Sequence, residues 1–156
     1  PHLTFLHHPD RMDGGRRVTP SSHKVYPPVR FRSVYNTRAG KTMQIAVISG
    51  SPKGEQSVTL QYVQFLEQAF PDYTFTVVHA GKEIRTIERQ EEVWDGLLAT
   101  VTESDGVLWA TPVYVMLVPA QLKRFVELID ERNATEVFSG KYTASLTTSI
   151  RFFDHT

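Results

Sequence analysis

The chain has 156 residues, of which 40% are hydrophobic, and a formal net charge of zero from 17 Lys/Arg and 17 Asp/Glu. This length suits one domain with a buried core. The absence of cysteine excludes disulfides, thiolate catalysis and cysteine-ligated clusters, and no apolar run approaches the ~18 to 20 residues of a membrane span.

The charge is unevenly distributed along the chain. Residues 1–42 hold eight Lys/Arg and two Asp/Glu, a balance of +6, and residues 43–156 carry −6. The first stretch has five prolines, four histidines and no helical periodicity, so burial can hardly offset its ordering entropy. We therefore expect residues 1–42 to be a disordered basic leader and residues 43–156 to form the folded domain.

Two other interpretations of the leader remain open. Its arginines could form a nucleic-acid arm, but they are dispersed and the acidic domain continues no basic patch, so we expect no nucleic-acid partner. Residues 29–35 partly alternate between apolar and polar, a pattern that could add an edge strand.

The most informative stretch runs from Met43 to Thr59. Residues 45–48 are apolar without alternation, which is typical of a buried parallel strand. Serines, glycines and a proline follow in residues 49–54, and then Ser57 and Thr59 supply hydroxyls where a helix would begin. Free N–H groups, the helix dipole and these hydroxyls predict a phosphate site.

The structural alternative is a Ser/Gly turn with Ser57 as a helix cap and no ligand. Two common phosphate loops are excluded. Gly50 and Gly54 are not followed by the Gly-Lys-Ser/Thr run of a P-loop. They also lack the three-glycine spacing of the dinucleotide fingerprint.

The remaining residues predict alternating helices and strands. Another buried strand, over residues 107–110, runs into a loop at Thr111-Pro-Val-Tyr114. It repeats the arrangement of the strand and loop that begin at Met43. The order β-α-β-α-β-α-β with short connections favours a parallel sheet with helices on both faces. The predicted elements after the first loop are a helix over 58–70, a strand over 73–80, a helix over 91–102, a strand over 107–110, a helix over 121–132 and a strand over 141–148.

These motifs together resemble the NAD(P)H-dependent FMN reductase family of flavodoxin-like proteins. The resemblance lies in Ser49-Gly-Ser-Pro52 through Ser57-x-Thr59, in Thr111-Pro-Val-Tyr114 with Leu122-Lys123, and in Leu146-Thr-Thr-Ser-Ile150 with Phe152-Phe-Asp-His-Thr156. It covers about residues 43 to 156. The chain lacks the cysteine cluster of related iron-sulfur flavoproteins.

The resemblance implies a flavodoxin-like doubly wound parallel sheet that binds its ligand between the first and third strands. The family normally adds a fifth strand and a final helix, so we expect a domain truncated before the fifth strand. The fourth strand would then be an edge that something else must cover.

The resemblance also implies which residues hold the flavin. The FMN phosphate would contact the first loop, with Lys53 adding charge at most. The second loop would border the isoalloxazine ring, and the third would approach its pyrimidine side. The implied residues are Ser49, Ser51, Lys53, Ser57, Val58 and Thr59 for the first loop, Thr111, Pro112, Val113 and Tyr114 for the second, and Thr147, Thr148 and Ser149 for the third.

Three further residues have plainer interpretations. Lys123 matches a family position, but a lysine on an amphipathic helix is more often a solvated surface residue. Trp109 lies within a strand and is expected in the core. His155 is the only histidine near the proposed site and could relay a proton.

The implied function is a cytoplasmic oxidoreductase, without a metal, that passes electrons from NADPH or NADH through FMN to a quinone, a flavin or another acceptor. The resemblance also implies a homodimer. Hydride transfer needs no side-chain acid or base, so no catalytic residue is assigned. The alternatives are a flavodoxin-like electron carrier without direct NAD(P)H turnover and a flavin-free interaction domain on the same fold.

Overall fold

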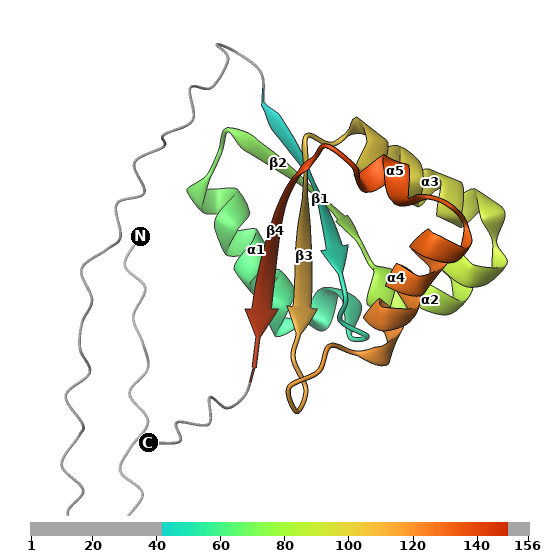
Figure 1. Ribbon diagram of the computed structural model, residues 1–156. Helices are drawn as coiled ribbons and strands as arrows, with labels where there is room; N and C mark the ends of the chain where they lie inside the picture. The colour runs from blue at the N-terminus through green and yellow to red at the C-terminus, as the bar shows by residue number, and fades with distance from the viewer. Residues whose placement is uncertain (1–41, 150–156) are drawn as a thin grey trace, which may run out of the picture. The chain divides into compact units, whose positions relative to one another are not determined.

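A parallel sheet forms the centre of the computed structural model, which describes residues 42–149 (Figure 1). Within these residues the sheet has four strands in the order β2-β1-β3-β4. The predicted flavodoxin-like parallel sheet is confirmed, and β1 and β3, which precede the two predicted ligand loops, are neighbours. The strands are β1 (Met43–Ser49), β2 (Tyr73–Val78), β3 (Gly106–Pro112) and β4 (Tyr142–Thr148).

Helices cover both faces of the sheet (Figure 1). On one face α1 (Val58–Ala69) places Leu60 and Val63 against Val47 of β1 and Leu108 of β3. The larger core lies on the other face. The elements that build it are α2 (Ala80–Arg89), α3 (Glu91–Glu103), α4 (Ala120–Glu131) and α5 (Thr135–Phe138).

The core of the second face is centred on Phe125 of α4, which is fully buried. The ring centroid of Phe125 lies 6.2 Å from that of Trp94 on α3 and 6.3 Å from that of Trp109 on β3. The prediction that Trp109 belongs to the core is therefore confirmed. Aromatic pairs at these separations add to the stability that burial of their area provides.

Two sequence predictions about element boundaries were wrong. The strand predicted over 73–80 ends at Val78, and the unpredicted helix α2 begins at Ala80. Ile84 and Ile87 are its only large apolar residues, so its sequence has a weak helical pattern. The strand predicted over 107–110 extends to Pro112, because Thr111 and Pro112 pair with Thr147 and Thr148 of β4.

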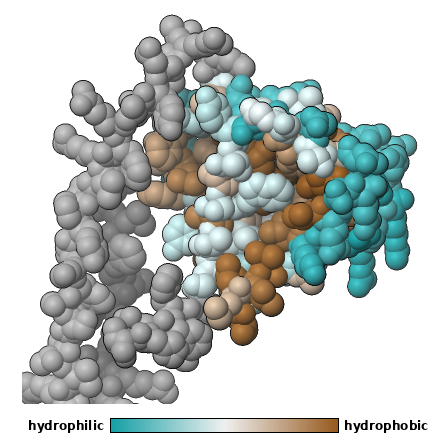
Figure 2. Space-filling model, viewed as in Figure 1, coloured by the Kyte–Doolittle hydropathy of each residue, from teal (hydrophilic) through white to brown (hydrophobic). Residues whose placement is uncertain are grey.

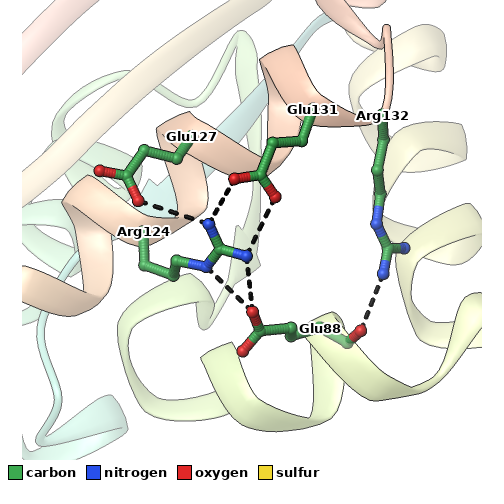
Figure 3. A network of polar contacts seen from close by, with 5 residues as sticks. All are labelled: Glu88, Arg124, Glu127, Glu131 and Arg132. Carbon is green, nitrogen blue, oxygen red and sulfur yellow. Dashed lines mark hydrogen bonds and ion pairs between the residues drawn. The ribbon is translucent and has the colours of Figure 1, made fainter.

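Arg124 joins α4 to α2 through a surface ion network (Figure 3). Its guanidinium donates to Glu88 at 2.7 Å, to Glu131 at 2.7 Å and to Glu127 at 3.4 Å. The hydrogen bond and the positive charge hold the pKa of Glu131 below its ordinary value. Arg132 adds a contact beside the network, with its guanidinium 4.9 Å from the centre of the Trp94 ring.

Exposed apolar side chains gather at the loop after β3, at the lower edge of the domain in Figure 2, and the charged helices form a hydrophilic surface beside it. None of the helices in the described part of the chain is long and apolar enough to cross a membrane. Residues 1–41 of the predicted leader, with the suggested edge strand at 29–35, lie outside the described residues.

Candidate functional site

The two loops that were predicted from separate motifs meet at the carboxyl ends of β1 and β3. The Gly50 N–H donates to the Ala110 carbonyl at 2.8 Å. A Cβ atom at Gly50 would lie 2.6 Å from Thr111 Oγ1 and 2.7 Å from Leu122 Cδ2. Only glycine fits this close approach, so the packing of Gly50 holds the first loop against the second.

The hydroxyl residues of the first loop are buried where the loop enters α1. Ser51, Ser57 and Thr59 are only 1%, 2% and 1% exposed. The short 3-10 helix η1 (Gly54–Gln56) lies between them. The Ser57 N–H donates to the Gly54 carbonyl at 3.0 Å, which closes the turn. Val58 and Lys53, in contrast, are exposed.

Ser57 occupies the position before α1, but its side chain makes no capping hydrogen bond. The alternative interpretation, in which the Ser57 side chain caps the helix and binds no ligand, therefore lacks its capping hydrogen bond. The N–H groups of Val58 and Thr59 open the helix and have no carbonyl acceptor within residues 42–149. They add donors and the positive end of the dipole of a 12-residue helix.

The donors fit a phosphate monoester. They are hydroxyl groups and backbone N–H groups, which satisfy phosphate oxygens without a metal. Ser49 Oγ, at the end of β1, is fully buried and has no hydrogen-bond partner in the described part of the chain. A buried unpaired hydroxyl is unusual, which makes Ser49 a further potential donor at this end of the sheet.

The hydroxyl of Thr59 has a partner within the protein. Thr59 Oγ1 lies 2.6 Å from Thr148 Oγ1. Both residues were predicted as flavin contacts, one for the phosphate and one for the ring. The two hydroxyls pair with each other, and the Thr59 N–H has no carbonyl acceptor within residues 42–149.

The second loop forms an exposed apolar hairpin. Tyr114 and Leu117 exchange two backbone hydrogen bonds, of 2.8 and 3.0 Å. Between them, Val115 and Met116 have φ values of 48° and 68° and are 92% and 88% exposed. A left-handed conformation is strained for a β-branched valine, and strained backbone gathers at ligand sites. The hairpin therefore has the features of a functional loop.

The third loop is tied to the second by its backbone. The Val113 N–H donates to the Thr148 carbonyl at 2.8 Å. Thr147 and Ser149 are exposed on either side of Thr148, while Pro112 is buried at the end of β3. The structure thus gathers the three predicted loops at one edge of the sheet. His155, with residues 150–156, lies outside the described residues.

Sequence reasoning missed two neighbours of the first loop, Gly81 and Lys82, because it missed α2. A helical pattern with only two isoleucines is a weak signal, and no motif marks these positions. Lys123, in contrast, lies on the surface as expected, with a side chain that is 75% exposed and 3.8 Å from Glu127.

A cavity of about 310 Å³ lies at the opposite end of the sheet, away from the three loops. It is lined by Leu66 and Phe70 of α1 and by Gly106 and Tyr142 at the starts of β3 and β4. Its lining is almost entirely apolar and offers no charged group for a phosphate. The gathered loops, and not this cavity, have the donors that the predicted chemistry requires.

Comparison with known proteins agrees with this geometry. A family model described as NADPH-dependent FMN reductase matches residues 43–153. No curated protein sequence matches the chain.

Two solved structures share the fold. The flavoenzyme NAD(P)H:(acceptor) oxidoreductase FerB from Paracoccus denitrificans has 22% identity and a TM-score of 0.57, over 69% of this chain and 61% of its own. RosB, solved with a bound intermediate, 8-demethyl-8-formylriboflavin-5'-phosphate, has 14% identity and a TM-score of 0.55, over 69% of this chain and 52% of its own. The chain thus spans between half and two thirds of the length of these two proteins.

Proposed function

We propose that this chain, which belongs to the NADPH-dependent FMN reductase family, binds FMN at the carboxyl ends of β1 and β3 and passes electrons from NADPH or NADH to an acceptor. The observation that supports this most strongly is the contact between the first and second loops at Gly50 and Thr111. It unites a set of phosphate donors with an apolar hairpin at the switch point of a doubly wound sheet, where such folds bind ligands.

The phosphate end of the site is assigned to the first loop. Ser51 and Ser57 supply side-chain hydroxyls, and Val58 and Thr59 supply backbone N–H groups. Hydrogen bonds from neutral donors to a charged oxygen are shorter and stronger than those between neutral groups. These donors would fix the position of the cofactor along the sheet edge.

The ring end of the site is assigned to the second and third loops. The backbone of residues 111–114 offers polar groups to the edge of a flavin ring, and the side chains of Pro112, Val113 and Tyr114 offer apolar contacts. Thr147 and Ser149 lie at the end of β4, beside the strand that carries the second loop. The hydrogen bond from Val113 to Thr148 holds these two walls together.

When bound, FMN supplies the redox chemistry by accepting a hydride from a nicotinamide and releasing the electrons to an acceptor. The protein has to hold the cofactor with one ring face open, so that the nicotinamide can approach it closely. No side chain among the three loops is required to move a proton in that step. The acceptor is proposed at the level of a quinone, a flavin or another small molecule or protein.

Two further assignments accompany this proposal. Residues 43–156 would carry flavin binding without help from the basic leader, a division that agrees with the extent of the family match. FMN titrations with and without residues 1–42 test it.

A homodimer is proposed as the working assembly. The hairpin and an exposed stripe on α1 offer apolar surface to a second copy. The stripe is formed by Val58, Tyr62 and Phe65.

Titration of the flavin-free chain with FMN and with riboflavin tests the proposal. Saturable binding that quenches flavin fluorescence and favours FMN supports a phosphate site in the first loop. Failure to bind either flavin under conditions where the chain is folded would contradict it.

A further inference from the structure

The amino end of α2 touches the main chain of the first loop. A Cβ atom at Gly81 would lie 2.4 Å from the Gly50 carbonyl oxygen and 2.8 Å from the Ser51 carbonyl carbon. Glycine is therefore needed where α2 begins. This contact brings the second residue of one helix against the loop that leads into another, α1.

The next residue of α2, Lys82, lies along the outside of the loop. A Cβ atom at Gly54, where φ is 55°, would lie 2.5 Å from Lys82 Cδ, 3.3 Å from Cε and 3.4 Å from Nζ. The methylene stem of Lys82 therefore packs on Gly54, and its ammonium group lies close to the turn. A side chain at position 54 would displace this lysine.

The ammonium of Lys82 makes no ion pair with a carboxylate of residues 42–149. Glu83 follows it in sequence and Glu55 follows Gly54, yet neither pairs with it. A lysine whose charge is not matched, held against a turn between Ser51 and Ser57, is available to an external anion. A lysine contacts phosphate as a compact point charge with three donors.

Lys53 is the alternative cation of the loop. Its backbone N–H donates to Ser51 Oγ at 3.3 Å, so its main chain helps to hold that hydroxyl. Like Lys82, the residue is exposed, and its side chain makes no ion pair within the described range. The two lysines differ in that the stem of Lys82 packs on Gly54.

We propose that Lys82 is a binding residue that supplies the cationic contact to the phosphate of FMN, an inference that rests on the proposed function. The ammonium would neutralise part of the phosphate charge while Ser51, Ser57 and the first N–H groups of α1 hold its oxygens. The close packing at Gly54 and Gly81 places the lysine there before the cofactor arrives. Little ordering entropy then remains to be lost on binding.

The test compares Lys82→Gln with Arg85→Gln as the control, because both remove one charge from the exposed surface of α2. Lys53→Gln is measured beside them, since it removes the alternative cation of the loop. The affinities of each variant for FMN and for riboflavin are measured at low and high salt. Lys82→Gln is expected to weaken FMN roughly tenfold to a hundredfold at low salt and to leave riboflavin unchanged. The loss should shrink at high salt, and Lys82→Arg should recover most of it.

Arg85→Gln is expected to change FMN affinity by less than about threefold, as for an exposed charge. Equal weakening of FMN and riboflavin by Lys82→Gln, or a selective loss in Lys53→Gln instead, would overturn the assignment to Lys82 while leaving the proposed function in place.

A second measurement uses inorganic phosphate with the flavin-free chain, so that Lys82 can be tested even if the parent binds no flavin. Phosphate should raise the thermal midpoint of the parent and of Arg85→Gln, and should raise that of Lys82→Gln much less. Equal shifts in all three proteins would overturn the inference. A parent that responds to phosphate but binds no flavin would contradict the proposed function and not the role of Lys82 at the anion site.

Discussion

The side-chain hydroxyls of Thr59 and Thr148 lie 2.6 Å apart and join the first turn of α1 to the end of β4. The two residues are 89 positions apart in the sequence. Thr59 is almost fully buried, and the backbone carbonyl of Thr148 also accepts the Val113 N–H. This pair therefore links the first loop to the second and third loops.

Removing either hydroxyl of this pair should destabilise the fold, because the remaining hydroxyl loses its partner. Thr59→Val and Thr148→Val should each lower the free energy of unfolding by about 0.5 to 1.5 kcal/mol, and the double variant by less than the sum. Urea unfolding measures all three. The control is Thr143→Val, at an exposed position on β4, whose loss of stability should add to that of Thr59→Val. If the losses of Thr59→Val and Thr148→Val also add, the contact between the two hydroxyls is contradicted.

The hydroxyls of Ser51 and Ser57 should recognise the phosphate of FMN and not its ring. Replacing both by alanine should weaken FMN by roughly 1.5 to 3 kcal/mol for each lost hydrogen bond, and should weaken riboflavin far less. Fluorescence titrations with the two flavins measure this difference. Ser145→Ala, on the exposed part of β4, is the control; equal weakening of both flavins by the double variant is incompatible with a phosphate role.

Gly81 and Gly96 form a matched pair for testing the contact between α2 and the first loop. Gly81→Ala would force its Cβ atom against the backbone of Gly50 and Ser51, so it should cost about 1 to 3 kcal/mol of stability and weaken FMN. Gly96 lies within α3, where an added Cβ would meet no atom of the described residues within 4 Å apart from the neighbouring backbone of its own helix. Gly96→Ala should therefore stabilise the protein by about 0.4 to 1 kcal/mol. Urea unfolding measures the free energy of unfolding of both variants. If both variants raise it or both lower it, the close approach at Gly81 is refuted.

The Arg124 network should stabilise the domain in a pH-dependent way without affecting the flavin site. Because the pKa of Glu131 is lowered in the folded protein from its ordinary 4.5, its contribution is fully present above that value. The contribution disappears as the pH falls through the folded pKa. Arg124→Met should therefore reduce stability at about pH 7, and by less at about pH 3.

Urea unfolding at the two pH values measures the effect of Arg124→Met, which added salt should also diminish. Arg85 is exposed on α2 and makes no ion pair within residues 42–149. The stability change caused by Arg85→Met should therefore depend on neither pH nor salt. Stability curves of parent and Arg124→Met that stay parallel across this pH range would show that the network contributes nothing through Glu131.

The sheet and two of the loops could be predicted because their signals are local. The apolar residues of β1 run directly into the hydroxyls at Ser51 and Ser57, and β3 runs into Thr111 in the same way. Periodic apolar faces identified α1, α3 and α4 to within a few residues of their observed ends. Local patterns of this kind are visible in a single sequence because each element buries one face.

The features that could not be predicted depend on contacts between distant segments. α2 has too few apolar residues to be recognised, and its packing on Gly50 depends on the absence of a Cβ atom at Gly81. The pairing of Thr59 with Thr148 depends on the register between β3 and β4. The two threonines are 89 positions apart, so no local pattern indicates that they are partners, and their ligand roles stay predictions.

In the proposed function, a flavin held by these loops is reduced directly by a nicotinamide nucleotide. The most direct test charges the full chain with FMN under anaerobic conditions, adds NADPH or NADH, and follows the visible absorption of the flavin. The proposed function predicts bleaching with saturable dependence on nucleotide concentration. A chain that binds FMN tightly, stays oxidised with both nucleotides and bleaches only after a partner reductase is added would contradict it and identify an electron carrier.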